Sequence, residues 1–331
     1  MKTTSTLIAA TAVFLIVGAQ APPAARAADS SVADPQASSA PPRNFNAIAL
    51  LRWYPANLTT SFAVGRGPQG VAFDGAHLWI ANSNDSTVSE LAASTGAVVG
   101  TFPVGTNPSA VAFDGANIWV ANKNSNNVTK LQASTGATLG TFAVGTFPDG
   151  IAFDGANIWV ANLLTNNVTE LSASSGAVVG TFAVGTFPTA VAFDGTNIWV
   201  ANSSSHTVTE LLASNGSTVG TFPVGKGPAG LVFDGAHIWV SNSGSNSVTE
   251  LMASTGAVLG TFAVGNFPIG LAFDGVDIWV ANSGSDFVSK LRAANGTVLG
   301  SFAAGSFPSG VAFDGANIWV TNTNSNNVSK F

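Results

Sequence analysis

Residues 108–145 read PSAVAFDGANIWVANKNSNNVTKLQASTGATLGTFAVG, and this stretch returns along the chain with a period of 40 residues. Two short apolar runs, Val111–Phe113 and Ile118–Val120, flank Asp114-Gly115, a pair that favours a tight hairpin. Val128–Leu131 then alternates apolar and polar residues, as a half-exposed strand does, and a fourth extended segment follows a Ser-Thr-Gly turn. The repeat therefore predicts four β-strands joined by turns, with no helical periodicity in any part.

Seven copies of this unit follow one another without insertion or deletion. Their aromatic and proline landmarks are Trp79, Trp119, Trp159, Trp199, Trp239, Trp279 and Trp319; Phe73, Phe113, Phe153, Phe193, Phe233, Phe273 and Phe313; and Pro68, Pro108, Pro148, Pro188, Pro228, Pro268 and Pro308. A period near 40 residues with strand-like content is typical of propeller blades rather than of helical solenoids. We predict an all-β fold, a seven-bladed β-propeller of four-stranded antiparallel blades.

The ends of the repeat array predict how the ring closes. The last copy stops at Phe331, after three strands, while Asn57–Val64 places Phe62 in phase with Phe302. We expect this N-terminal segment to supply the fourth strand of the last blade and so to remove two free sheet edges. Ala47–Leu51 is in phase with Asn327–Phe331, so two segments compete for the third strand. We favour Asn327–Phe331, because it is continuous with its own blade.

The N-terminal residues before the array have a different character. A basic start at Lys2 and an apolar run from Leu7 to Ala19 precede Ala25-Arg26-Ala27, which matches the cleavage rule for a secretory signal peptide. We predict a signal peptide over 1–27, a disordered Ala/Ser/Pro linker over 28–43 and the propeller over 44–331. The expected location is secreted or periplasmic.

The net charge and the cysteine content limit the classes of partner that the chain is expected to bind. Cleavage removes Lys2 and Arg26 from 11 basic residues and leaves nine against 17 acidic ones, a formal charge of −8. This sign argues against nucleic acid, whose binding depends on Lys and Arg contacts to phosphate. No later apolar run is long enough for membrane insertion, and the chain has no cysteine for disulfides or thiolate chemistry. We expect a monomer stabilised by burial and ring closure.

The repeat also resembles known bacterial propeller repeats. Trp119-Val120-Ala121-Asn122 stands where YVTN repeats have Tyr-Val-Thr-Asn, and Pro148–Phe153 (PDGIAF) is similar to the opening of NHL repeats. The resemblance covers about residues 57–331 and implies the propeller fold. It does not imply one activity, because such propellers include binding modules, surface proteins and a few enzymes.

Streptogramin lyases are enzymes of this fold, and the resemblance implies a histidine general base, acidic residues and a magnesium ion on the central face. The chain has three histidines, His77, His206 and His237. His77 and His237 precede the second strand, at the end of the ring opposite His206. We therefore expect no cluster of histidine and glutamate, and we predict no catalytic residue, no metal site and no cofactor.

Three repeated polar positions have structural explanations. The Asp-Gly pairs that begin at Asp74 and end at Asp314 suit tight hairpins, and the asparagines from Asn82 to Asn322 are expected to form turns. Glutamate and lysine alternate at one third-strand position, as at Glu90 and Lys130. A position that accepts either charge predicts an exposed strand face.

Binding residues are expected where the copies differ. Blade-to-blade connections and second-to-third-strand loops should open on one rim, with the residues after each proline lining a central mouth: Gln69, Ser109, Asp149, Thr189, Ala229, Ile269 and Ser309. The candidate binding residues on this rim are Phe147, Phe187, Phe267, Phe307, Asp149, Leu163, Leu164 and His206. The phenylalanines either pack into grooves between blades or form an apolar contact surface.

Two functions remain open. The first is a non-enzymatic binding or scaffold propeller for an unknown protein, glycan or small-molecule ligand. The alternative is a lyase-like or lactonase-like enzyme whose metal would be held by carboxylates at the mouth. Asp149 is the single acidic residue among the seven mouth positions, and this favours the binding protein.

Overall fold

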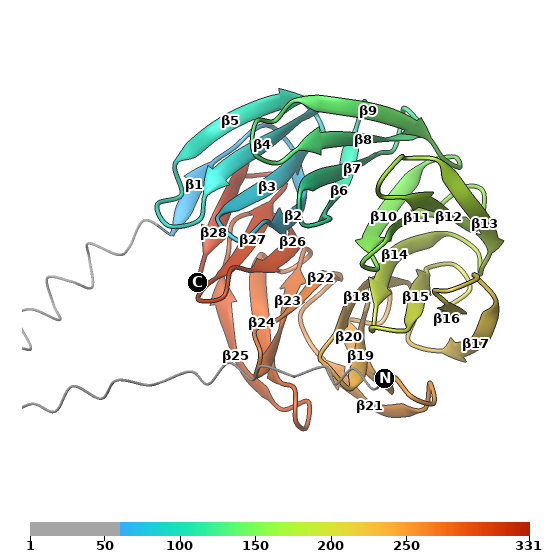
Figure 1. Cartoon of the computed structure of the whole chain (residues 1–331). Coiled ribbons are helices and arrows are strands. Elements are labelled where there is room, and N and C mark those ends of the chain that lie inside the picture. The colour runs from blue at the N-terminus through green and yellow to red at the C-terminus, as the bar shows by residue number, and fades with distance from the viewer. Residues whose placement is uncertain (1–59) are drawn as a thin grey trace, which may run out of the picture. The chain divides into compact units, whose positions relative to one another are not determined.

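The computed structural model describes residues 60–331 and consists of seven four-stranded sheets arranged in a ring. Figure 1 shows the sheets side by side around a centre, and neighbouring first strands contact one another all the way round, from β2 to β26 and back. The seven-bladed all-β prediction is confirmed. No helix in this described part is long and apolar enough to cross a membrane. The predicted signal peptide, the linker and Ala47–Leu51 lie outside the described residues.

The first two strands of each blade form a hairpin next to the centre. The first strands are β2 (Pro68–Phe73), β6 (Pro108–Phe113), β10 (Pro148–Phe153), β14 (Pro188–Phe193), β18 (Pro228–Phe233), β22 (Pro268–Phe273) and β26 (Pro308–Phe313). The second strands are β3 (His77–Asn82), β7 (Asn117–Asn122), β11 (Asn157–Asn162), β15 (Asn197–Asn202), β19 (His237–Asn242), β23 (Asp277–Asn282) and β27 (Ile318–Asn322).

The other two strands complete each sheet outward. The third strands are β4 (Thr87–Ala92), β8 (Asn127–Gln132), β12 (Asn167–Ser172), β16 (Thr207–Leu212), β20 (Ser247–Met252), β24 (Phe287–Arg292) and β28 (Asn327–Lys330). The fourth strands are β5 (Val98–Pro103), β9 (Thr138–Ala143), β13 (Val178–Ala183), β17 (Thr218–Pro223), β21 (Val258–Ala263), β25 (Val298–Ala303) and β1 (Ser61–Ala63). Blades 1 to 6 each contain four consecutive strands from β2 to β25, and blade 7 contains β26, β27, β28 and β1.

The Asp-Gly pairs form the hairpins between the first and second strands, as predicted. Gly75 has a φ of 102°, a conformation that costs glycine little. Asp74 Oδ1 accepts hydrogen bonds from the N–H groups of Ala76 and His77, and its Oδ2 accepts one from the indole N–H of Trp79 at 2.8 Å. The same aspartate–indole bond occurs in all seven blades. The hairpin is thus tied to the largest side chain of the core.

The core lies between adjacent blades. Six of the seven repeat tryptophans are fully buried and Trp279 is 7% exposed. Trp79 of blade 1, for example, packs in one cluster with Ile118 and Leu131 of blade 2, and its ring lies 5.5 Å from that of Phe102 on the fourth strand of its own blade. Each blade is therefore stabilised by its neighbour.

The third strands are more buried than the sequence predicts. In β4 the four central residues, Val88 to Leu91, are all buried, whereas in β5 exposed and half-buried residues alternate from Gly100 onward. The asparagines that end the second strands do not act as turn formers. Asn82, fully buried, donates from its amide nitrogen to the hydroxyls of Thr87 and Ser89 on β4.

Ring closure follows the predicted three-plus-one arrangement. β1 pairs antiparallel with β28, with Phe62 opposite Val328, and the Phe62 ring lies 5.3 Å from Trp319. β28 in turn pairs with β27, so the C-terminal segment fills the third strand, as favoured. Within residues 60–331 the closing strand is Ser61–Ala63, shorter than the predicted Asn57–Val64, of which residues 57–59 lie outside the described part.

Candidate functional site

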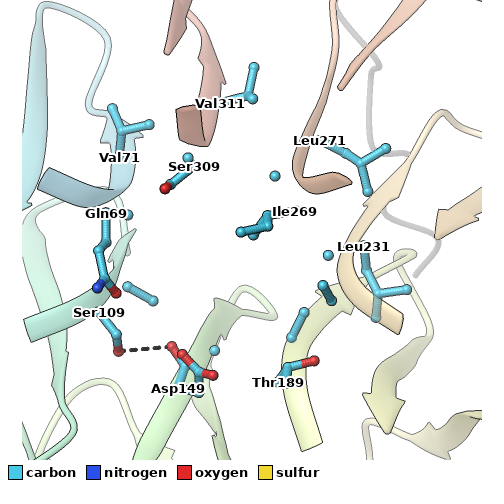
Figure 2. A pocket seen from close by; sticks show the side chains of 18 of the residues that line it. Gln69, Val71, Ser109, Asp149, Thr189, Leu231, Ile269, Leu271, Ser309 and Val311 are labelled. Carbon is cyan, nitrogen blue, oxygen red and sulfur yellow. Dashed lines mark hydrogen bonds between the residues drawn. The ribbon is translucent and has the colours of Figure 1, made fainter. Parts of the chain in front are cut away.

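The mouth of the ring is a cavity of about 500 Å³. The seven residues that follow the repeat prolines all line it, as the sequence predicts: Gln69, Ser109, Asp149, Thr189, Ala229, Ile269 and Ser309. Figure 2 labels all of them except Ala229. The first strands place them there, because each strand begins at its proline and runs alongside the first strands of both neighbours. The lining is mostly small, apolar or hydroxyl-bearing.

One ion pair supplies the charge of this cavity. Lys123 Nζ lies 2.7 Å from Asp149 Oδ1, and the two side chains are 16% and 20% exposed. The Ser109 hydroxyl donates to the backbone carbonyl of Asp149 at 3.0 Å (Figure 2). Among the residues of 60–331 that line the cavity, only Lys123 and Asp149 are titratable. Lys123 was missed as a site residue, although it is the only basic residue in the chain that directly follows a second-strand asparagine.

The connections between blades and the loops between second and third strands lie on one rim, as predicted, and we call it the mouth rim. The N–H groups of Leu163 and Leu164 donate to the carbonyls of Phe147 and Thr146 at 3.0 and 3.1 Å. The predicted pair of leucines therefore lies beside Phe147. Leu164 is 51% exposed.

The four candidate phenylalanines share an unusual backbone conformation. Phe147, Phe187, Phe267 and Phe307 have φ values of 59°, 56°, 53° and 57°. The equivalent residues in other blades are Gly67, Asn107 and Gly227, which are types that adopt positive φ readily. A bulky residue in this region is an outlier.

A side-chain amide or carboxylate oxygen of the preceding blade accepts a hydrogen bond from the backbone N–H of each of these phenylalanines. Asn126 Oδ1 accepts the N–H of Phe147 at 2.9 Å, and Asn166, Asn246 and Asp286 do the same for Phe187, Phe267 and Phe307. The backbone conformation is thus imposed by the scaffold. The side chains themselves pack against none of the core clusters in residues 60–331.

The four rings differ in their surroundings. Phe187 is 43% exposed and Phe267 is 48% exposed, whereas Phe147 and Phe307 are half-buried. Phe267 and Phe307 line the mouth cavity. Lys123 Nζ lies over the ring of Phe147, 5.6 Å from its centroid. Asp149, Phe267 and Phe307 therefore line one cavity, Phe147 lies beside its Lys123, and Phe187 does not line it.

His206 has a different environment from the other candidates. It occupies the repeat position of Asn166, has a φ of 57°, and its Nδ1 lies 3.2 Å from the N–H of Gly227 and 2.9 Å from the carbonyl oxygen of Ser203. The contact with the N–H of Gly227 reproduces the one that the asparagines make with the other connections. His206 does not line the mouth cavity.

Two predictions are wrong for the opposite rim, which is formed by the Asp-Gly hairpins and the turns before the fourth strands. The alternating glutamate and lysine position is not an exposed face: Glu90, Glu170, Glu210 and Glu250 are 6%, 4%, 4% and 7% exposed, and Lys130 is 8% exposed. The reason is geometric. Each of these side chains lies directly across the ladder from the tryptophan, inside the groove between two blades.

Histidine–carboxylate clusters do form on this rim, contrary to prediction. His77 Nδ1 lies 3.4 Å from Glu90 Oε1 and 3.5 Å from Asp74 Oδ2, and a hollow of about 820 Å³ between blades 1 and 2 reaches all three. His237 lies likewise 3.5 Å from Glu250 and 3.1 Å from Asp234. The sequence holds a signal for this, because both histidines occur in copies that carry glutamate thirteen residues later.

Burial and hydrogen bonds shift the pKa values of these two carboxylates in opposite directions. Burial raises the pKa of Glu90, which the charge of His77 lowers only in part. Burial also opposes ionisation of Asp74, but hydrogen bonds from the Trp79 indole and from two backbone N–H groups lower its pKa overall. No group of three His, Cys, Asp or Glu residues in the described range is arranged to hold a metal ion.

Comparisons with known proteins show similarity of fold. No protein-family model and no curated protein matches the chain. Among solved structures, hydrazine synthase of Kuenenia stuttgartiensis superposes with a TM-score of 0.72 at 20% identity, over 83% of this chain and 98% of that chain. A streptogramin B lyase gives 0.70 at 18% identity, over 82% and 95% of the two chains. Virginiamycin B lyase of Staphylococcus aureus gives 0.70 at 17% identity, over 82% and 97%. Ring, repeat and neighbours agree, and the chain is a seven-bladed β-propeller.

Proposed function

We propose that this protein is an exported, non-enzymatic binding propeller whose ligand or partner docks on the mouth rim. The observation that carries the proposal is the backbone of the four rim phenylalanines, each at a φ between 53° and 59°. A non-glycine residue held in such a region costs of order 1–3 kcal/mol, and such residues cluster at functional sites.

The other blades give the internal comparison. Glycine and asparagine occupy the same connection in three blades at little conformational cost, so the scaffold does not require phenylalanine there. Phe187 and Phe267 direct much of their surface to solvent, and core packing does not explain them. An apolar contact surface at the mouth does explain them, because association recovers the cost through burial of the rings.

The mouth cavity suggests what the ligand contains. Its volume of about 500 Å³ lies within the range of small-molecule pockets. The Lys123–Asp149 pair offers a donor and an acceptor on one side, while Ile269 and the rings of Phe267 and Phe307 offer apolar surface. A ligand, glycan or protein loop that combines a polar group with an apolar portion fits this arrangement.

The alternative is a lyase-like or lactonase-like enzyme, since two of the similar solved structures are streptogramin lyases. Such chemistry needs a general base at the mouth. Among the described residues that line the cavity, Asp149 is the only carboxylate, and Lys123 already pairs with it. A binding role therefore has more support than catalysis. We also propose that the repeats belong to the YVTN or NHL class and that export uses the signal peptide over 1–27.

The test replaces rim phenylalanines by the residue that the scaffold itself prefers. Proteins and glycans of the culture medium are captured on the 28–331 chain and compared with captures on Phe267→Asn/Phe307→Asn. Asparagine already occurs at Asn107 in this conformation, so the melting temperature should not fall. The amount of a ligand bound specifically should fall about fivefold or more, which corresponds to roughly 1 kcal/mol.

A matched control removes apolar surface elsewhere. Val179→Ser/Val258→Ser changes two side chains that are 58% and 50% exposed on outer strands, and it should capture as much ligand as the parent. Unchanged capture by the phenylalanine variant would refute a docking role for the rim. A melting temperature lower by several degrees would instead identify the rings as packing residues.

A further inference from the structure

The seven grooves between blades have the same framework but different charges. In each groove the third-strand residue opposite the tryptophan is Glu90, Lys130, Glu170, Glu210, Glu250, Lys290 or Lys330, and an aspartate bonded to the indole lies beside it. The grooves therefore serve as internal controls for one another.

Three grooves show where an ammonium group fits. The Nζ atoms of Lys130, Lys290 and Lys330 lie 4.8, 4.8 and 4.9 Å from the centroids of the tryptophan rings of their own blades. Lys130 Nζ donates to the carbonyl of Ala173 in the next blade at 2.7 Å, and Lys330 Nζ approaches the carbonyl of Ala93 at 3.4 Å. Lys290 Nζ instead lies 2.9 Å from Asp277 Oδ2 and 3.7 Å from Asp274 Oδ2. Each such groove is a cage of one aromatic face and oxygen acceptors around a primary ammonium.

Two further grooves carry a histidine as their cationic group. His77 lies between Asp74 and Glu90 in blade 1, and His237 lies between Asp234 and Glu250 in blade 5. Five of the seven grooves thus contain a lysine or a histidine next to their carboxylate.

Blades 3 and 4 lack this cation. Each has a pair of carboxylates, Asp154 with Glu170 and Asp194 with Glu210, and the histidine position is Asn157 or Asn197. The asparagine amide donates to one oxygen of the glutamate at 2.8 Å in both blades. Within residues 60–331 the other oxygen, Oε2, accepts no hydrogen bond and neither glutamate is in a salt bridge. Both residues are only 4% exposed, and Oε2 keeps contact with solvent, since it is not among the fully buried unpaired atoms.

We propose that the grooves of blades 3 and 4 bind primary alkylammonium groups, at the place that Lys130, Lys290 and Lys330 fill in their own blades. The acceptors are Glu170 with Asp154 and Glu210 with Asp194, and the ammonium faces the rings of Trp159 and Trp199. By the repeat, the next-blade carbonyls equivalent to that of Ala173 belong to Ala213 and Ala253. The glutamate side chain is shorter than that of lysine, so it does not itself reach the place that Nζ fills in the lysine blades.

The chemistry selects a primary amine. Three N–H donors match two carboxylates and one carbonyl, and the aromatic face favours a cation. The source can be a free diamine or a lysine side chain that a partner inserts. Because blades 3 and 4 are adjacent in the ring, a diamine or two neighbouring lysines can engage both grooves.

The test follows the tryptophan indole N–H signals of ¹⁵N-labelled protein by NMR, at about pH 8. Cadaverine, n-butylammonium and an acetylated peptide with a single lysine are titrated in turn. The signals of Trp159 and Trp199, assigned with Trp159→Phe and Trp199→Phe, should shift saturably while those of the lysine blades do not. A stronger response to the peptide would point to a protein partner, and a stronger response to cadaverine to a free diamine.

The variants exchange charges between blades. Glu170→Lys/Glu210→Lys supplies the ammonium within the chain and should abolish both responses. Glu170→Gln/Glu210→Gln should weaken them about tenfold or more, because a charge-assisted hydrogen bond is lost at each site. Lys130→Glu rebuilds the blade 3 arrangement in blade 2, with Asp114, Asn117 and Trp119 already present, and should make the Trp119 signal respond.

Three results would overturn the proposal. One is the absence of any shift at Trp159 and Trp199. Another is an equal shift with tetramethylammonium, which has no N–H donor, or with sodium chloride, because either would indicate general screening. The third is an undiminished response in the double lysine variant. Since these grooves lie on the rim opposite the mouth, a failure here leaves the proposed mouth function untouched.

Discussion

Individual residues in this propeller owe their roles to the groove in which the repeat places them. The aspartate of each hairpin also accepts a hydrogen bond from the indole N–H of its blade, as Asp194 does from Trp199 at 2.7 Å. Across the ladder, burial, and secondarily the charge of Asp194, raise the pKa of Glu210 to about 7. The repeat therefore gives the aspartate a hydrogen-bonding role and makes the neighbouring Glu210 a weak acid.

The raised pKa of Glu210 predicts a pH dependence of stability. An unfolded glutamate titrates near 4.5, so the folded state holds more protons between pH 4.5 and about 7. The free energy of unfolding should fall as pH rises through this window. Glu210→Gln should flatten the decline and leave the chain more stable than the parent at about pH 8, as urea unfolding at several pH values would measure.

Asp85 provides a control of opposite sign. A hydrogen bond from the backbone N–H of Arg66, and then its side chain, lower the pKa of Asp85, so this carboxylate stabilises the fold above its unfolded pKa of 3.8. Asp85→Asn should reduce stability at neutral pH and have little effect in acid. If Glu210→Gln behaved in the same way as Asp85→Asn, the raised pKa of Glu210 would be wrong.

At the level of strands, each blade depends on elements that it does not itself contain. The buried second and third strands pack against the next blade, and the half-exposed fourth strand covers the tryptophan through its phenylalanine. In blade 7 the C-terminal segment provides only three strands, and the fourth is β1 from the other end of the described chain. β1 is three residues long, yet it places Phe62 on Trp319 and covers the edge of β28.

Removal of β1 should therefore destabilise the whole ring. A chain that begins at Gly65 leaves β28 as a free edge and exposes Trp319, so we expect aggregation or a melting temperature lower by several degrees. A chain that begins at residue 44 should melt like the chain that begins at residue 28. Calorimetry on the three chains is the measurement, and equal melting temperatures for all three would show that β1 does not close the ring.

The whole molecule separates two kinds of surface. The mouth rim carries the irregular residues, with Lys123, Asp149, Phe267 and Phe307 around one cavity. The opposite rim carries seven related grooves that differ in how their carboxylates are neutralised. The packed core between blades lies between the two rims, and in the described part of the chain the mouth cavity and the grooves have no lining side chain in common.

Substitutions on the two rims should consequently have independent effects. Phe267→Asn/Phe307→Asn should leave the alkylammonium titration at Trp159 and Trp199 unchanged, and Glu170→Lys/Glu210→Lys should leave ligand capture at the mouth unchanged. Free energies of distant sites without common partners usually add. Combining the four changes and measuring both responses tests this, and a non-additive result would indicate coupling through the ring.

The sequence by itself was sufficient for the architecture. Seven copies at a constant spacing predict seven blades, and the position at which Phe331 ends the last copy predicts closure by the segment around Phe62. The seven mouth positions were also predictable, because one residue after each proline must face the axis of a ring built from identical hairpins. Because the unit is repeated, the pattern of one copy also predicts the arrangement of the whole ring.

Only the tertiary structure decided which polar residues share an environment. Glutamate and lysine at one repeat position suggest solvent in the sequence, whereas the neighbouring blade covers that position and buries Glu210 and Lys130. His77 and Glu90 are thirteen residues apart and become neighbours only through the pairing of β3 with β4. Phe267 likewise combines a positive φ with a hydrogen bond from its N–H to Asn246 of the preceding blade. Each of these features depends on contacts between strands or blades, which a pattern along one strand does not contain.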